Sequence, residues 1–166
     1  MTRALFIGRF QPLHNAHLKV IKDILKENDR LIIIIGSSLE RNTKLNPFSF
    51  KERKEMIDAV LKANKIKNYS IVPVPDVYND KKWVNLIERK VKHFDALYTG
   101  NPWTIRCFKR YGRKVRKIKL IKGISSTIIR NAIIKGKNWK GLVPEQIYSY
   151  IKKIKGEERI KQKRKL

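Results

Sequence analysis

Cysteine, acidic residues and long apolar runs are all scarce in this chain of 166 residues. The single cysteine, Cys107, excludes an intramolecular disulfide framework and a metal cluster held by cysteines. The longest apolar run, residues 31–35, is far shorter than the roughly 20 residues that a membrane-spanning helix needs. The N-terminus shows no succession of basic, apolar and small residues, so we expect no secretory signal and a cytoplasmic location.

The shortage of acidic residues leaves a strongly basic chain, with 40 Lys and Arg against 14 Asp and Glu and a formal net charge of +26. Residues 1–100 carry 19 basic and 11 acidic side chains, whereas residues 101–166 carry 21 and 3. Such a surface suits a polyphosphate such as nucleic acid. A lysine- and isoleucine-rich composition produces the same surplus, so the charge alone names no function.

Short apolar runs alternate with amphipathic stretches, without an internal repeat or a linker rich in Gly, Ser or Pro. This alternation predicts a Rossmann-like, doubly wound α/β fold with a parallel five-stranded sheet and extra C-terminal helices. We expect a single domain over residues 1–156 and a basic C-terminal tail or frayed helix over 157–166. The expected strands are 4–7, 31–35, 70–74, 95–98 and 115–118, and the expected helices are 16–26, one after Ser49, 81–92, 102–111, 126–135 and 144–155.

The most informative segment is GRFQPLHNAH at 8–17, which follows the first expected strand and opens the first expected helix. His14 and His17 are three residues apart, so they share one face of the first helical turn. The helix start adds free N–H groups and the positive end of the helix dipole, and Arg9 adds a charge. Together they predict a phosphate-binding site. A zinc site is the weaker alternative, because no third ligand is evident nearby, and a lone histidine here is more often a cap.

A second segment, GISSTIIR at 123–130, opens another expected helix late in the chain. Ser and Thr hydroxyls at a helix start leave backbone N–H groups for phosphate oxygens, and Arg130 follows one turn later. Alone, such a segment is a common helix cap. Combined with the first segment, it predicts a second set of phosphate contacts.

The two segments resemble the signatures G-x-F-x-P-x-H-x-G-H and I-S-S/G-T-x-x-R of the nucleotidyltransferase superfamily. Ala16 stands where the first signature has glycine, which a helical first turn allows. The pieces between them resemble archaeal-type nicotinamide-nucleotide adenylyltransferases, and this resemblance covers essentially the whole chain in order. These pieces are Gly36-Ser37, Asn46-Pro47-Phe48 with Glu52-Arg53, Asp76 with Trp83, 98–102 and 156–160.

The resemblance implies one nucleotidyltransferase domain that transfers an adenylyl group from ATP to nicotinamide mononucleotide (NMN), giving NAD and pyrophosphate. It implies catalytic roles for His14, His17, Arg9 and Arg130 at the ATP phosphates. It implies Mg²⁺ accompanying ATP without an assigned protein ligand, small-molecule substrates, no specific nucleic acid, no membrane, and a homo-oligomer. The residues that it implies for binding the adenosine and phosphates are Gly8, Phe10, Gly100, Asn101, Ile124, Ser125, Ser126 and Thr127.

On the NMN side the resemblance implies Gly36, Ser37, Asp80 and Trp83. Relatives usually carry asparagine at the position of Asp80. An ionised Asp only accepts hydrogen bonds, so Asp80 would accept from the carboxamide of NMN and repel the carboxylate of nicotinic acid mononucleotide. Two alternatives stay open: Asp80 points to solvent, and Trp83 is a core residue instead of a stacking platform for nicotinamide.

Other transferases of the same fold share the histidine and Ser-Ser-Thr segments. Pantetheine phosphate, flavin mononucleotide and glycerol phosphate are therefore alternative acceptors, and only the residues around Gly36, Asp80 and Trp83 discriminate among them. A basic nucleic-acid-binding module is an alternative from a different functional class. It predicts tight and strongly salt-dependent binding of DNA or RNA.

Overall fold

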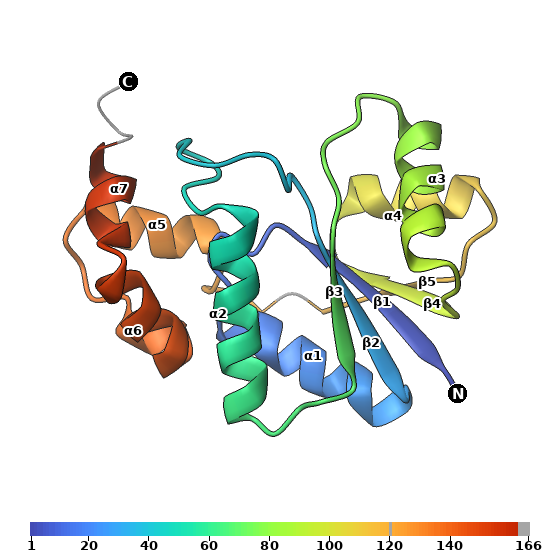
Figure 1. The fold of residues 1–166 in the computed structure, drawn as a ribbon, viewed down its shortest axis with the longest axis horizontal. Helices are drawn as coiled ribbons and strands as arrows, with labels where there is room; N and C mark the ends of the chain where they lie inside the picture. The colour runs from blue at the N-terminus through green and yellow to red at the C-terminus, as the bar shows by residue number, and fades with distance from the viewer. Residues whose placement is uncertain (120, 163–166) are drawn as a thin grey trace. The chain divides into compact units, whose positions relative to one another are not determined.

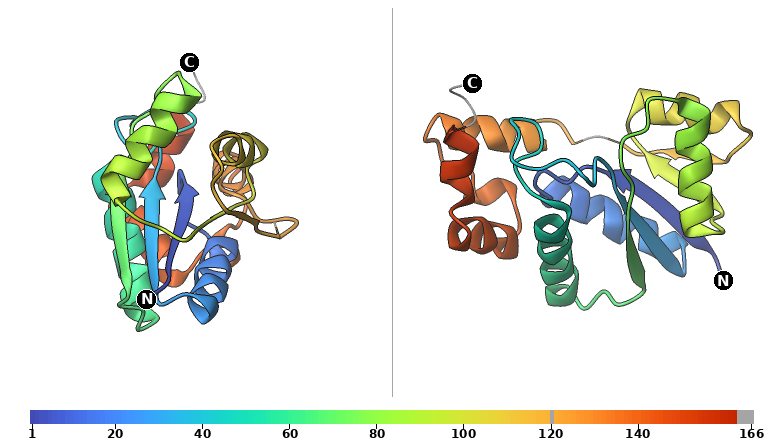
Figure 2. Two further views of the ribbon diagram at one scale, coloured as in Figure 1. Left: turned by 90° about the vertical axis from the view of Figure 1, so that its right-hand side faces the viewer. Right: turned by 45° about the horizontal axis from the view of Figure 1, so that its top comes forward.

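The computed structural model describes residues 1–119 and 121–162 and contains a five-stranded sheet (Figures 1 and 2). Neighbouring strands are parallel, in the order β3-β2-β1-β4-β5. The expected doubly wound α/β fold is thereby confirmed. The strands are β1 (Arg3–Gly8), β2 (Arg30–Ile35), β3 (Tyr69–Pro73), β4 (Ala96–Thr99) and β5 (Val115–Lys117).

The central strands are buried, as expected for parallel strands that are covered on both faces. In β2, residues 31–35 are at most 1% exposed. Leu5 of β1 and Leu97 of β4 join one apolar cluster with side chains of α3 (Asp80–Val91) and α4 (Pro102–Arg110). The uninterrupted apolar runs of the sequence therefore correspond to strands without a solvent-facing side.

The helices begin and end close to the positions expected from the sequence. Ser49 caps α2 through a capping box with Glu52, as the spacing of the two residues predicted. No helix among the described residues has the length and apolar character that crossing a membrane requires. The remaining helices are α1 (Asn15–Glu27), α2 (Phe50–Ala63), α5 (Ser126–Ile134), the 3₁₀ helix η1 (Lys140–Leu142), α6 (Glu145–Lys153) and α7 (Gly156–Gln162).

Residues 157–162, for which we expected a basic tail or a frayed helix, belong to the packed helix α7. Ile160 is buried, and the Arg159 guanidinium forms an ion pair with Glu52 at 2.9 Å. Glu157 adds an ion pair with Lys152 at 2.6 Å and accepts from Trp139 Nε1 at 2.7 Å, so several contacts together order this charged segment. Residues 163–166 of the expected tail lie outside the described residues.

Residue contacts divide the chain into two compact units. The first, called the sheet unit, comprises Met1–Gly8, Lys19–Ser38 and Asn68–Leu120. The second, called the helical unit, comprises Arg9–Leu18, Leu39–Lys67 and Ile121–Leu166 and contains α2, α5, α6 and α7. The single domain expected over residues 1–156 stays a prediction.

The strand order of the sheet reverses at β1, which has β2 on one side and β4 on the other. In open α/β sheets, ligands bind beyond the carboxyl ends of the strands that flank such a reversal. Here β1 ends at Gly8, β2 at Ile35 and β4 at Thr99. The segments that follow these three ends carry many of the site residues predicted from the sequence.

Candidate phosphate-binding site

The loop after β1 is anchored by the buried side chain of Gln11. Its Nε2 donates to the Phe48 carbonyl at 2.9 Å, and its Oε1 accepts from the Phe48 N–H at 3.0 Å. The preceding residue, Phe10, has a φ of 52°, a left-handed conformation that is uncommon for a residue with a side chain. The two hydrogen bonds tie the loop to the residue just before the α2 cap and hold this conformation in place.

Two arginines donate to backbone carbonyls of the same loop. Arg53 Nη1 donates to the Arg9 carbonyl at 2.9 Å, and Arg130 Nη1 donates to the Gln11 carbonyl at 2.8 Å. Both guanidiniums are buried, one on α2 and the other on α5. The course of the loop is therefore set by residues that are far away in sequence.

His14 and His17 cap the start of α1 reciprocally. The His17 N–H donates to His14 Nδ1 and the His14 N–H donates to His17 Nδ1, each at 3.3 Å. The arrangement is that of a capping box, with imidazole nitrogens in place of a hydroxyl and a carboxylate. Because both Nδ1 atoms accept, the proton of each neutral ring is assigned to Nε2, which makes Nε2 a donor.

The histidine pair is held in its neutral form. The two rings stack with centroids 3.6 Å apart, and the Phe10 ring meets His17 edge-on at 4.9 Å. Burial lowers the pKa of His14 from 6.5 to about 4. Burial, and secondarily the neighbouring His14, also lowers the pKa of His17. Near neutral pH the pair therefore supplies hydrogen-bond donors without adding charge.

The start of α5 lies against the same loop. Ser125 caps the helix by accepting from the Ile128 N–H at 3.1 Å, and Ser126 Oγ donates to the Pro12 carbonyl at 2.9 Å. The hydroxyl of Thr127 accepts from Arg130 Nη2 at 3.3 Å. The predicted serine and threonine segment thus caps its own helix and also positions the loop.

Arg9 and Arg130 bring two positive charges to this loop. Burial lowers the pKa of Arg130, and the nearby Arg9 guanidinium lowers it further. Both guanidiniums stay charged, because arginine is not deprotonated in proteins. Two like charges beside two neutral imidazole donors form an arrangement that a polyanion stabilises. The helical unit therefore brings together the four residues expected to contact phosphates: Arg9, His14, His17 and Arg130.

Other residues predicted for the site lie in the sheet unit. The Gly36 N–H donates to the Gly8 carbonyl at 2.9 Å, next to the carboxyl ends of β1 and β2. Ser37 is buried and donates from Oγ to Asp76 Oδ1 at 3.0 Å. Asn101, which follows Gly100 after β4, caps α4 through Oδ1 and accepts from the next backbone N–H groups. Its carboxamide oxygen therefore already has a structural role.

Trp83 and Asp80 differ sharply in exposure. Trp83 is 5% exposed and packs against Phe108 and Trp103, with ring centroids 5.8 and 4.7 Å away. Asp80 is exposed at the first turn of α3. Burial, and then the Asp80 carboxylate beside it, raises the pKa of the Cys107 thiol to about 11. Asp80 is thus adjacent to α4 at the edge of an apolar core.

Comparisons with known proteins identify the family. A family model described as cytidylyltransferase-like matches residues 5–132. The chain belongs to the cytidylyltransferase-like family. Within it, the chain is 41% identical to the nicotinamide-nucleotide adenylyltransferase of Thermoplasma volcanium, across 96% of this chain and 91% of that protein. It is also 41% identical to the protein of that name from Picrophilus torridus, across 96% of this chain and 95% of the relative.

A solved structure supports the same family. It is a bifunctional NMN adenylyltransferase/ADP ribose pyrophosphatase from Francisella tularensis, crystallised with AMP and a manganese ion. The two folds match with a TM-score of 0.84 at 26% identity, over 99% of this chain. This chain spans 53% of that longer protein. These relatives confirm the resemblance to nicotinamide-nucleotide adenylyltransferases.

The donors of this cytidylyltransferase-like site suit phosphate oxygens better than a bare metal ion. Mg²⁺ prefers oxygen ligands, commonly carboxylates, whereas the loop is surrounded by guanidiniums, imidazoles and hydroxyls. Nowhere in residues 1–119 and 121–162 do three or more His, Cys, Asp or Glu residues gather as metal ligands would. The residues around the loop therefore fit phosphate oxygens.

Sequence reasoning assigned no role to Arg53 or Gln11 in this family member, although both hold the loop. Arg53 had a detectable signal: it precedes Ile57 by four residues and Val60 by seven, so it falls on the apolar stripe of α2. A charged residue on such a stripe indicates a buried charge with specific partners. Gln11 had no comparable signal, because a glutamine in a loop is usually solvated.

Proposed function

We propose that this protein transfers the adenylyl group of ATP to NMN, forming NAD and releasing pyrophosphate. The observation that carries the proposal is the gathering of Arg9, Arg130 and two imidazoles around one loop and the helix starts next to it. It occurs in a chain that is 41% identical over most of its length to enzymes named for this reaction. A direct transfer needs no nucleophile–base pair, and none is evident in the predicted motifs.

The reaction requires little from the protein beyond positioning of the two substrates. The second pKa of a phosphate monoester is about 6, so the NMN phosphate is already a nucleophile at neutral pH and needs no general base. One of its oxygens forms a bond to the α-phosphorus of ATP, and the bond from that phosphorus to the bridging oxygen of pyrophosphate breaks. Negative charge moves onto pyrophosphate, where fixed cations and donors stabilise it.

We assign the residues of the helical unit to these tasks. His17 Nε2 donates to the α-phosphoryl group undergoing transfer, and His14 Nε2 donates to an adjacent phosphate oxygen. Arg9 and Arg130 hold the β- and γ-phosphates, whose charge they balance. Because the imidazoles are neutral, they donate without adding like charge to the two arginines. Mg²⁺ enters with ATP and supplies further charge neutralisation when bound.

The remaining binding assignments are also proposals. Ile124, Ser125, Ser126 and Thr127 of the helical unit, and Gly8, Gly100 and Asn101 of the sheet unit, contact the ATP or NAD nucleotide. Phe10 is buried and packs edge-on against His17, which favours support of that ring over direct ligand contact.

Gly36, Ser37, Asp80 and Trp83 are the candidates for the NMN side. Nicotinamide can stack on Trp83 only if the side chains that cover this ring move. Trp103 is the first candidate to move, because it is 39% exposed and packs against Trp83. Trp83 otherwise serves the core of the sheet unit. The exposure of Asp80 fits contact with a substrate and fits solvent equally well, so a specificity assay decides its role.

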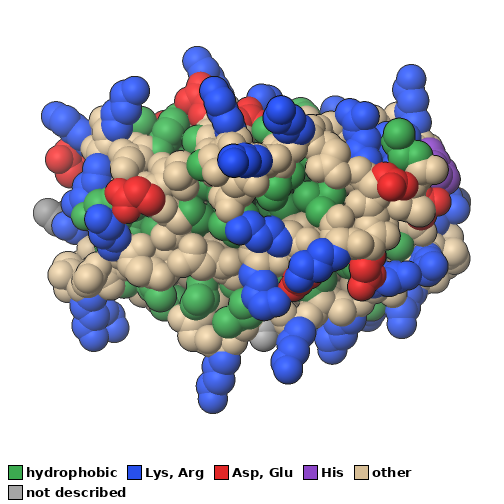
Figure 3. All heavy atoms as spheres, turned by 90° about the horizontal axis from the view of Figure 1, so that it is seen from below, with side chains coloured by type: hydrophobic (Ala, Val, Ile, Leu, Met, Phe, Trp, Pro, Cys, Tyr) green, Lys and Arg blue, Asp and Glu red, His purple; other side chains and the backbone are tan. Residues whose placement is uncertain are grey.

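The surplus of positive charge has a kinetic role in this proposal. Lys and Arg side chains are spread over the face shown in Figure 3. Such a field raises the rate at which anionic ATP and NMN reach the protein, and salt suppresses the effect. The homo-oligomeric state implied by the resemblance and the cytoplasmic location expected from the sequence stay predictions.

The deciding experiment incubates the protein with ATP, Mg²⁺ and one acceptor at a time, followed by a pyrophosphate assay. NMN, nicotinic acid mononucleotide, pantetheine phosphate, flavin mononucleotide and glycerol phosphate are the acceptors. We expect pyrophosphate and NAD with NMN, and loss of both products when the metal is chelated. Product with a flavin or pantetheine acceptor and none with NMN contradicts the proposal.

A further inference from the structure

Arg53 is a fully buried charge on helix α2, with 0% of the residue exposed. Removing a guanidinium from water costs free energy that only well-placed hydrogen bonds offset. An apolar residue of similar length would bury the same volume without that cost. The presence of a charged group here therefore points to a geometric role that an apolar side chain cannot fill.

The contacts of Arg53 show which segments it joins. Its Nε donates to the Ser49 carbonyl at 3.2 Å, one turn earlier on the cap of α2. Its Nη1 donates to the Arg9 carbonyl at 2.9 Å, in the loop after β1. The planar guanidinium thus bridges two backbone segments with nitrogens at a fixed separation, which a single lysine ammonium does not reproduce.

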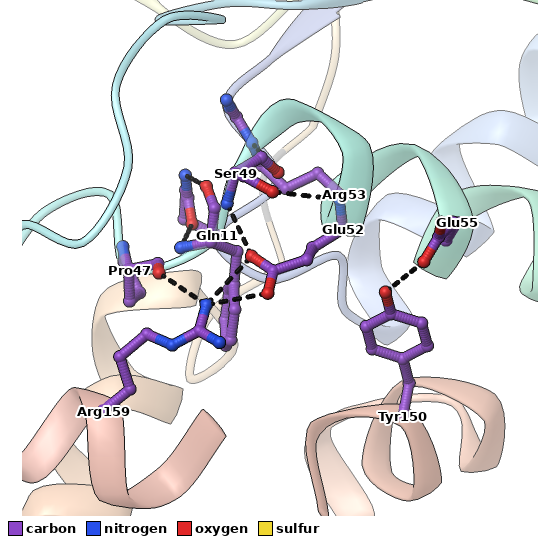
Figure 4. Close-up of polar contacts among 9 residues, drawn as sticks. Gln11, Pro47, Ser49, Glu52, Arg53, Glu55, Tyr150 and Arg159 are labelled. Atoms are coloured by element: carbon purple, nitrogen blue, oxygen red, sulfur yellow. Dashed lines mark hydrogen bonds and ion pairs between the residues drawn. The ribbon is translucent and has the colours of Figure 1, made fainter. Parts of the chain in front are cut away.

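Arg53 lies in the first turn of α2, and further contacts hold this end of the helix in place (Figure 4). Glu52 Oε2 accepts from the Ser49 N–H at 2.8 Å and closes the capping box. Arg159 Nη1 lies 2.9 Å from both Glu52 oxygens and donates to the Pro47 carbonyl at 3.2 Å. Helix α7 therefore stabilises the end of α2 from which Arg53 reaches the loop.

We propose that Arg53 is a positioning residue for adenylyl transfer, which holds the Arg9 carbonyl and thereby sets the geometry of the phosphate-binding loop. This inference rests on the proposed function. Arg53 acts through the backbone of the loop that presents Arg9, and α2 supplies the rigid support. A displacement of about 1 Å in such a loop reduces turnover by about 100-fold.

The test compares Arg53→Lys and Arg53→Met with the matched variant Lys54→Met. Lys54 is the next residue on α2, is exposed and pairs with Asp58 at 2.6 Å. We expect Arg53→Lys to fold and to lose about 100-fold in kcat/KM, mainly in kcat. Arg53→Met should lose at least as much if it folds, whereas Lys54→Met should stay within about twofold of wild type.

A double-mutant cycle separates positioning from general stability. In an Arg9→Lys background, Arg53→Lys should lower kcat/KM by only about threefold, because the group that it positions is already altered. Thermal unfolding of each variant identifies any loss that follows from a smaller folded fraction. If Arg53 were purely structural, kcat per folded molecule would stay unchanged. Activity per total protein would then fall by the same factor in the wild-type and Arg9→Lys backgrounds.

Two results overturn the inference: Arg53→Lys activity equal to that of Lys54→Met, or the full loss repeated in the Arg9→Lys background. Failure of the proposed function gives a different result, in which wild-type protein binds ATP but forms no NAD. In that case the same double-mutant cycle is evaluated from ATP dissociation constants instead of kcat/KM. Equal ATP affinities for wild type and Arg53→Lys would then overturn the positioning role as well.

Discussion

The loop of the helical unit and the acceptor candidates of the sheet unit are built in contrasting ways. In the loop, the Arg9, Gln11 and Pro12 carbonyls each accept a hydrogen bond from a side chain on α2 or α5. Among the acceptor candidates, Asp80 is exposed and Trp83 belongs to an apolar core. Phosphate groups present the same kind of oxygen in every nucleotide, so a loop with fixed donors suits them, whereas we expect the choice of acceptor to depend on a few side chains of the sheet unit.

Replacement of His17 by alanine tests the loop most severely and has the largest expected effect. The variant loses the Nε2 donor assigned to the α-phosphoryl group, so kcat should fall about 100-fold or more, as for loss of one oxyanion-type donor. Steady-state rates of NAD formation measure this fall in kcat. The matched control is His93→Ala, because His93 is 65% exposed in its side chain and pairs with Asp95. An H17A variant within twofold of wild type removes His17 from the mechanism.

The buried histidine pair also predicts a pH dependence of stability. The folded protein holds the pKa of His14 at about 4, whereas the unfolded chain has the ordinary value of 6.5. Between these two values the unfolded chain binds more protons, so stability falls as the pH drops from about 6.5 towards 4. The loss should reach on the order of 3 kcal/mol from His14 alone.

Urea unfolding at several pH values between 7 and 4 measures this dependence. The control is His14→Asn, since asparagine also caps a helix but does not titrate. The profile of His14→Asn should be flatter across this window than that of wild type. Parallel profiles for the two proteins would show that His14 is not held neutral, and the loop would then lack the proposed uncharged donors.

Asp80 tests the acceptor side and has the smallest expected effect. We expect wild type to prefer NMN over nicotinic acid mononucleotide in kcat/KM, and Asp80→Asn to reduce that preference by about fivefold, because one exposed charge repulsion is lost. Asp58→Asn makes the same charge change on α2 and should leave the ratio unaltered. Equal kcat/KM for the two mononucleotides in wild type, or a ratio unchanged in Asp80→Asn, contradicts the role of Asp80.

Local sequence patterns predicted the sheet and the helix starts of the two segments proposed to bind nucleotide, because their determinants lie close together in the chain. The apolar run 31–35, the i, i+3 histidines and the serine cap before α5 each involve neighbours within one turn or one strand. Periodicity left the role of Trp83 open, because a tryptophan on an amphipathic helix suits both a core and a ligand. Its burial against Phe108 favours the core.

Contacts between distant residues escaped prediction. The order of α7 depends on Arg159 reaching Glu52, 107 residues away, and the course of the phosphate loop depends on Arg53 reaching Arg9, 44 residues away. Neither pairing leaves a periodic pattern in the sequence. The charged composition of 157–162 instead suggested a tail or a frayed helix, since a single buried isoleucine is too weak a signal.

The reciprocal histidine cap also restricts where either ring can take up a proton. Each Nδ1 accepts from the backbone N–H of the other histidine, so a proton added to Nδ1 would face another N–H group and break that hydrogen bond. Burial disfavours the charged rings as well and lowers the pKa of both. Acid should therefore open the start of α1, where the loop joins the helix.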